Sequence, residues 1–226
     1  MLPCISFAQK TDKEIKADKL FDNFFYAKAI DVYQDATGLT TNGVRNLGYA
    51  YWAINDYKEA EAQYKMVVAS SDFIPEDVFQ YAELLKMNGK HEEGEEWLEK
   101  FHELNKSDGR GIRYHKSREA YKSLKADNGQ FEIRNLIINS EQEDFGAVFY
   151  QNKVVFASSR EGVKGVRRRW NWNQLPFLDI YIADRMSNGE LRDLALIGKN
   201  IAGKFHEGPA SFDSTGNYMV FTSDDY

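Results

Sequence analysis

The sequence is poor in cysteine and proline, and it lacks long apolar runs. Cys4 is the only cysteine among the 226 residues, so a disulfide framework within the chain is excluded. No stretch approaches the ~18 consecutive apolar residues of a transmembrane helix. Hydrophobic residues still make up 42% of the chain, which is enough to build cores. We therefore predict two packed domains without a membrane span.

A concentrated basic face is also missing. The formal net charge is −6, and the one local exception is the basic run Arg167–Arg169. Because contacts to phosphate groups need clustered cations, this balance argues against nucleic acid as a partner.

Motifs that carry catalysis or metal binding are not found in the sequence. Its four histidines show no metal-ligand spacing, and it contains no GxSxG elbow, HExxH helix or P-loop. The pair His206–Glu207 is an acid/base candidate, and we interpret it as the end of a loop that positions a strand. We predict no enzyme activity, no cofactor, and no catalytic or metal-binding residue.

The first eight residues resemble the end of a secretory signal. Ser6-Phe7-Ala8 is a small-x-small pattern like a signal-peptidase site, which would leave Gln9 as the mature N-terminus. The basic region and most of the apolar region of such a signal are missing, so we expect a signal shortened at its start. The alternative is a simple apolar arm. An exported chain cut after Ala8 would fold without any cysteine.

Residues 9–104 have helical apolar spacing that recurs with a period of about 34 residues. Asn55-Asp56 and Asn88-Gly89 predict breaks between paired helices, and Pro75 predicts a helix start. Small residues where paired helices meet alternate with large residues that fill the space between pairs. The small residues are Ala29, Gly48, Ala60, Ala82 and Gly94, and the large ones are Tyr33, Tyr51, Tyr64, Leu85 and Leu98. These residues resemble tetratricopeptide repeats (TPRs), with clear copies at 41–74 and 75–106 and a weaker copy at 10–40.

In tetratricopeptide repeats the inner face usually holds a peptide or a partner helix. Carried onto this chain, the resemblance assigns that face to Arg45, Tyr49, Trp52, Phe79, Glu83 and Lys86. The alternative is that the three aromatic residues only pack against the neighbouring repeat, since helical periodicity does not separate exposed from buried aromatics.

Residues 105–130 are interpreted as a helical cap and linker. A polar break at Asn105–Gly111 precedes a basic helical stretch, Ile112–Leu124, and a turn at Ala126–Gly129 ends it. After this point the apolar period changes to two. Six segments are predicted as strands, namely 131–138, 146–150, 154–157, 178–183, 194–197 and 218–222.

Two hairpins in this second half are similar to each other. Phe149 and the strand after the turn Gln151-Asn152 correspond to Phe212 and the strand after the turn 213–217. The first strands align at an offset of 63 and the second strands at an offset of 65, so the later turn is two residues longer. A recurring hairpin favours a repeated-sheet architecture.

Four segments carry a further resemblance: Pro176–Asp184, Asn188–Leu191, His206–Phe212 and Phe221–Ser223. They look like the WD40-like propeller repeat of bacterial envelope proteins. Preceded by tetratricopeptide repeats, this resembles the N-terminal part of Bacteroidetes OmpA-family, peptidoglycan-associated proteins. The resemblance implies a periplasmic location at the outer membrane and envelope or secretion-apparatus proteins as partners. It also implies peptidoglycan binding only through a C-terminal domain absent here.

The stretch between the hairpin copies, residues 160–175, is predicted to protrude as a loop. Arg168, Trp170 and Trp172 would lie at its tip, where clustered Arg and Trp favour partner binding. The alternative is a loop that folds back and packs its tryptophans on the sheets.

The fold predicted from these patterns is α+β in separate domains: a helical TPR-like solenoid, then the first blades of a β-propeller in residues 131–226. Since a propeller needs ~4–8 blades, we expect these blades to be incomplete; a small β-sandwich is the alternative. The functional hypothesis is a non-enzymatic envelope scaffold. The competing hypothesis is the substrate-filtering part of an exported propeller-containing hydrolase.

Overall fold

The computed structural model of the protein describes residues 10–124, 132–161, 169–198 and 200–224. Contacts divide these residues into two compact units. The helical unit contains residues 10–124 together with Asn171–Asn173, and the β unit contains the remaining described residues.

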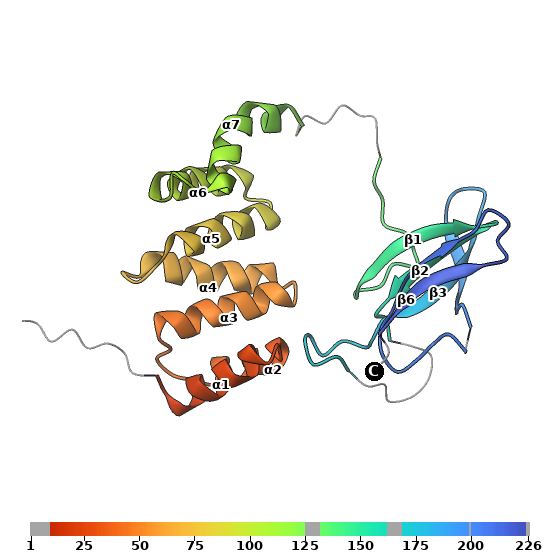
Figure 1. The fold of residues 1–226 in the computed structure, drawn as a ribbon, viewed down its shortest axis with the longest axis horizontal. Helices are drawn as coiled ribbons and strands as arrows, with labels where there is room; N and C mark the ends of the chain where they lie inside the picture. The colour runs from red at the N-terminus through yellow and green to blue at the C-terminus, as the bar shows by residue number, and fades with distance from the viewer. Residues whose placement is uncertain (1–9, 125–131, 162–168, 199, 225–226) are drawn as a thin grey trace, which may run out of the picture. The chain divides into compact units, whose positions relative to one another are not determined.

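The helical unit is a stack of helical hairpins (Figure 1). Helix α1 pairs with α2, α3 with α4, and α5 with α6, while α7 packs on α6. The helices are α1 (Asp12–Asp22), α2 (Tyr26–Gln34), α3 (Thr41–Ala53), α4 (Tyr57–Ala69), α5 (Pro75–Met87), α6 (His91–Leu104) and α7 (Gly109–Leu124). None of the helices within the described residues is both long and apolar enough to cross a membrane.

Side chains at the helix starts explain where the helices begin. The hydroxyl of Thr40 accepts a hydrogen bond from the Gly43 N–H at 3.1 Å, and the Asp56 carboxylate accepts one from the Glu59 N–H at 3.3 Å. Pro75 occupies the first turn of α5, as predicted. Each of these groups satisfies or removes a backbone donor that the helix itself leaves unpaired.

Two predicted breaks end helices as expected. Asn55 follows α3 with φ +67°, and Gly89 follows α5 with φ +79°, both in the left-handed region. Phe24, between α1 and α2, has φ +61°, which is costly for a bulky residue and gave no sequence signal. The predicted break at 105–111 extends too far, since α7 already begins at Gly109.

The alternation of small and large residues builds the helical core as predicted. Gly48 packs against the Tyr64 ring, and a Cβ there would lie 2.9 Å from that ring. A Cβ at Gly94 would lie 2.9 Å from the Ala82 carbonyl oxygen. The predicted alanines and large residues are all buried, and they are Ala29, Ala60, Ala82, Tyr33, Tyr51, Tyr64, Leu85 and Leu98. Small residues thus let α3 approach α4 and α5 approach α6.

The β unit contains a four-stranded antiparallel sheet in the order β1-β2-β3-β4 and a two-stranded hairpin, β5-β6. The strands are β1 (Asp144–Tyr150), β2 (Lys153–Ser158), β3 (Asp179–Arg185), β4 (Leu191–Leu196), β5 (Glu207–Phe212) and β6 (Met219–Ser223). Both hairpins predicted from the recurrence are therefore present. Strand β5 packs on β1, β2 and β3, so the second hairpin covers one face of the sheet.

Both faces of the four-stranded sheet carry apolar side chains. Val155 and Ile180 pack with Ala210 of the covering hairpin, whereas Val154, Phe156 and other side chains form a cluster on the opposite face. Strand β2 is buried from Val154 to Ser158, because it lies between β1 and β3 and apolar side chains cover both of its faces.

The strand predicted at 131–138 is wrong for its described part, since residues 132–143 contain no strand. The alternating apolar pattern suggested one buried face, but Ile133 is 95% exposed and Ile137 is 81% exposed. Only Leu136 and Ile138 pack on the sheet. The six strands within the described residues form one sheet and one hairpin and do not close into a ring.

Candidate functional site

Helices α3, α5 and α7 present equivalent residues on one face. They begin at Thr41, Pro75 and Gly109, so equal stretches of sequence separate their starts. Residues at the same offset therefore occupy the same helical position. One row contains Arg45, Phe79 and Arg113, a second contains Tyr49, Glu83 and Ser117, and a third contains Trp52 and Lys86. We call this set the α3–α5–α7 face, and it contains all six inner-face residues predicted from the sequence.

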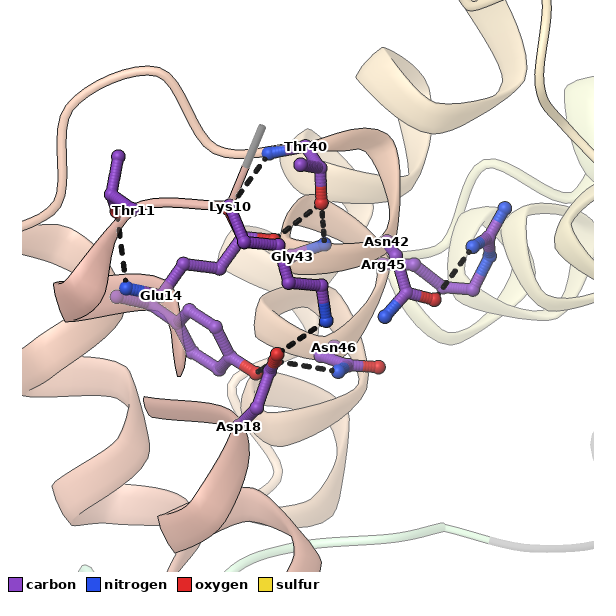
Figure 2. Close-up of polar contacts among 10 residues, drawn as sticks. Lys10, Thr11, Glu14, Asp18, Thr40, Asn42, Gly43, Arg45 and Asn46 are labelled. Atoms are coloured by element: carbon purple, nitrogen blue, oxygen red, sulfur yellow. Dashed lines mark hydrogen bonds and ion pairs between the residues drawn. The ribbon is translucent and has the colours of Figure 1, made fainter. Parts of the chain in front are cut away.

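A buried carboxylate joins α1 to the start of α3 (Figure 2). Glu14 is fully buried and accepts hydrogen bonds from the Thr40 backbone N–H, at 3.1 Å, and from the Thr40 hydroxyl. Gly43 is required at this junction, because a Cβ there would lie 2.5 Å from Glu14 Oε1. The carboxylate is thus held by the helix start that it contacts.

Asp18 makes a second connection between these helices (Figure 2). Its carboxylate accepts hydrogen bonds from the Lys10 ammonium at 2.5 Å, the Tyr33 hydroxyl at 2.5 Å and the Asn46 amide at 3.1 Å. Burial alone would raise the pKa of Asp18, but the hydrogen bonds from Lys10, Tyr33 and Asn46 outweigh it and lower the pKa.

Arg45 joins α3 to α5 through a bidentate ion pair with Asp77. Its Nε lies 2.7 Å from Asp77 Oδ1, and its Nη2 lies 2.9 Å from Asp77 Oδ2. Asp77 is buried and also accepts a hydrogen bond from the Ile74 N–H at 2.9 Å. This geometry makes Arg45 a structural connection between the repeats.

Arg110 makes the corresponding connection between α5 and α7. Its guanidinium donates to both Glu76 carboxylate oxygens, at 3.0 and 2.7 Å, and to Asp108. The same group lies 4.2 Å from the centre of the Phe79 ring. Hydrogen bonding to Arg110 lowers the pKa of Glu76. Successive odd-numbered helices are therefore linked by polar contacts, which hold the α3–α5–α7 face in register.

The aromatic residues on this face are partly buried. The Tyr49 ring lies 5.6 Å from Phe21, 5.8 Å from Tyr26 and 5.2 Å from Trp52, and Phe79 packs against Phe101. Tyr49, Trp52 and Phe79 all pack on the main core while keeping part of their surface exposed. They thus contact the neighbouring repeat and also contribute apolar surface to the face.

A small pocket lies at the α5–α7 end of the face. It has a volume of about 200 Å³ and is lined by Lys86 of α5 and by Arg113, Tyr114 and Ser117 of α7. Lys86 also forms an ion pair with Glu83 at 2.9 Å. Arg113 and Ser117 were not predicted as binding residues, because the sequence pattern indicated a cap and linker at residues 105–130. Their positions, one repeat period after Phe79 and Glu83, were the signal that could have revealed them.

The three predicted loop residues have different outcomes. Arg168 lies outside the described residues. Trp170 belongs to the β unit and packs edge-on against the His206 ring, with ring centres 4.8 Å apart. Trp172 belongs to the helical unit, where its Nε1–H donates to the Ala53 carbonyl at 2.8 Å and its ring packs against Tyr26. Both tryptophans therefore have ring contacts within their own unit.

His206 has a structural environment that agrees with its interpretation as a strand-positioning residue. Its Nδ1 accepts a hydrogen bond from the Leu178 N–H at 3.1 Å, and burial lowers the pKa of the imidazole. Glu207 is buried and accepts a hydrogen bond from the Gly203 N–H at 2.9 Å. In the part of the chain that the structure describes, no group of three or more His, Cys, Asp or Glu side chains is placed to hold a metal ion.

Comparison with known proteins finds similarity in solved structures only. No protein-family model and no curated protein matches the chain. The first TPR of Spaghetti (RPAP3), bound to an HSP90 peptide, is 20% identical; the match covers 54% of this chain and 100% of that one, with a TM-score of 0.43. The Sgt2 TPR domain from Aspergillus fumigatus is 14% identical; the match covers 60% of this chain and 95% of that one, with a TM-score of 0.44.

The second TPR domain of human RPAP3, in complex with an HSP70 peptide, gives a similar result. It is 20% identical, and the match covers 50% of this chain and 93% of that one, with a TM-score of 0.41. The helix pairs and the equal spacing of α3, α5 and α7 along the sequence are properties of this chain itself. They define its first unit as a TPR-like helical repeat.

Proposed function

We propose that the protein is a non-enzymatic scaffold that binds an extended segment of a partner protein on the α3–α5–α7 face. The observation that supports this best is the alignment of three helices that begin at equal intervals and repeat the same positions on one face. A repeated surface suits a partner that runs across several repeats. Partly exposed aromatic residues beside charged groups supply apolar contact area and orientation at the same place.

The finer proposal is a scaffold of the bacterial cell envelope, similar to the OmpA-family proteins. The β unit would form the first blades of a WD40-like propeller, located in the periplasm at the outer membrane. Two observations support this proposal: the recurring hairpin, and a sheet that carries apolar clusters on both faces, as a blade between neighbouring blades would. The partners would be envelope or secretion-apparatus proteins.

The test is site-specific cross-linking in envelope extracts. A benzophenone amino acid placed at Glu83, on the face, should cross-link a discrete protein on illumination. The matched control places the same group at Lys65, an exposed position on α4 outside the face. We expect the Glu83 product to be absent from the Lys65 sample. Identical products at both positions, or none at Glu83 in a folded protein, would contradict binding on this face.

A further inference from the structure

The β unit contains a pocket on the face of the four-stranded sheet opposite the β5-β6 hairpin. Phe149 of β1 pairs with Val154 of β2, and Arg185 of β3 pairs with Leu191 of β4, so the side chains of each pair lie on the same face. All four line the pocket, and Leu136, from the segment before β1, forms a further wall. The remaining lining residues are Ala147, Val148 and Gly189.

The wall that contains Leu136 is held in place by polar contacts. The Arg134 guanidinium donates from Nη2 to the Asn188 carbonyl at 3.1 Å, and its Nη1 lies 3.3 Å from Glu190 Oε1. These contacts attach the segment before β1 to the turn between β3 and β4, where Gly189 lies. The pocket is therefore part of the folded unit, as ligand pockets usually are.

The size and lining of the pocket suit a small apolar molecule. Its volume of about 320 Å³ is close to the lower end of the range for ligand sites. At the ~30 Å³ that one water occupies in the liquid, this is room for roughly ten non-hydrogen atoms. Most of the lining is apolar, and the Phe149 ring is 70% exposed and can contact a ligand.

Arg185 is the cationic residue among those that line the pocket. Its guanidinium carbon lies 5.0 Å from the centre of the Phe149 ring, and this cation–π contact holds the charge beside the apolar surface. Within the described residues, no carboxylate forms an ion pair with Arg185. Its donors are thus available to an anion.

Other charged side chains near the pocket offset one another. Arg134 pairs with Glu190, and Lys153 of β2 pairs with Asp184 of β3. Exposed Arg192 and Asp193 are neighbours in β4, so their charges also cancel. The remaining acidic residues of the lining segments are Glu132, which is exposed, and Asp144 and Asp179, which lie at the ends of β1 and β3 away from Phe149 and Arg185. The excess charge at the pocket is therefore the positive charge of Arg185.

We propose that this pocket binds a small apolar molecule that carries one anionic group, such as a medium-chain carboxylate. The apolar body packs against Phe149, Val154 and Leu191, and the Arg185 guanidinium donates charge-assisted hydrogen bonds to the anion. The inference goes beyond the proposed function, because it assigns a small ligand to the β unit and makes no use of the α3–α5–α7 face.

The test is an NMR titration of the full chain, in which the backbone amide signals are followed as the ligand is added. The probes are octanoate and octylammonium, which have the same apolar chain and opposite charges. We expect octanoate to shift signals around Phe149 and Leu191 and to bind at least about tenfold more tightly than octylammonium. Because the whole chain has a net charge of −6, non-specific attraction would favour octylammonium instead.

Three variants locate the site. Arg185→Gln should weaken octanoate binding by about tenfold, because the anion loses its charged donor. Arg192→Gln makes the same change on an exposed residue of β4 outside the pocket and should weaken binding about twofold or less. Ala147→Phe should weaken octanoate binding by about tenfold or more, because the added ring occupies the pocket, and Ala147 is exposed on β1, where an aromatic residue favours the strand.

Circular dichroism checks that each variant is folded. Equal losses in Arg185→Gln and Arg192→Gln would overturn the site, as would equal binding of the two probes or no binding of octanoate to the wild-type chain. Binding that survives in a folded Ala147→Phe variant would also place the ligand elsewhere. Cross-linking at Glu83 does not depend on any of these results, so the pocket and the proposed function fail independently.

Discussion

The two units use sequence repetition differently. In the helical unit the repeat period is retained in space, since α3, α5 and α7 begin at equal intervals along the chain and present the same positions on one face. In the β unit the two similar hairpins have different environments. Val155 of β2 is 0% exposed, whereas Val220, its counterpart in β6, is 73% exposed. A sequence repeat therefore determines local structure in both units, but it determines burial only where neighbours also repeat.

The largest loss of unfolding free energy is expected in the helical unit, on breaking the ion pair between α3 and α5. Asp77→Ala would leave the Arg45 guanidinium without its carboxylate and remove the acceptor of the Ile74 N–H. Breaking a buried pair in this way costs about 3–5 kcal/mol of unfolding free energy. Hydrogen exchange should show faster exchange in α3 and α5 and little change in β2 and β3.

Asp35→Ala serves as the control for this prediction, because Asp35 is an exposed partner of Lys13. Its effect on unfolding free energy should stay within about 0.5 kcal/mol. An equally small effect of Asp77→Ala would show that the polar contacts do not hold the repeats in register.

The two hairpins give a matched pair of substitutions. Val155→Ala should destabilise the β unit by about 2 kcal/mol, because it removes fully buried methyl groups and leaves a cavity. Val220→Ala should change the unfolding free energy by about 0.5 kcal/mol or less. Chemical denaturation measures both. Equal effects would mean that β6 is as well covered as β2.

Acid should weaken the β unit through Asp144. Burial would raise its pKa, but hydrogen bonds from Ser158, Ser140 and Arg160 lower it below the ordinary value of 3.8. The ionised form thus stabilises the fold above pH 3.8, and this contribution is lost as the pH falls through the lower folded-state pKa. Asp144→Asn should cost about 1.5 kcal/mol at pH 7 and flatten the dependence of stability on pH below about 4. An unchanged dependence would contradict this role.

The smallest change in unfolding free energy is expected for a substitution in the turn between β1 and β2. Gln151 has φ +53°, in the left-handed region that favours glycine. Gln151→Gly should raise the unfolding free energy by up to about 1 kcal/mol, because relief of strain exceeds the added freedom of the unfolded chain. Thermal unfolding checks the sign. The same change at Lys153, within β2, should be destabilising.

The sequence predicted the helix pairs, the small and large core residues and both hairpins, because each has a local period. It did not predict that Arg45 pairs with Asp77, a contact between residues far apart in the chain and without any local pattern. The strand predicted at 131–138 was wrong for the opposite reason. Its described part has alternating apolar residues, but no neighbouring strand pairs with it. Arg113 was missed because the change to basic composition in α7 obscured the continuing period.

The bulge in β1 has a consequence for behaviour at high protein concentration. β1 lies at the edge of the four-stranded sheet in the described part of the chain, with the Phe145 and Phe149 side chains exposed. Gly146, with φ +65°, shifts the ladder between Phe145 and Val148 and seats its backbone against Pro209. An edge interrupted in this way is a poor template for pairing with a second chain. We therefore expect Gly146 to lower the tendency of this exposed strand to aggregate.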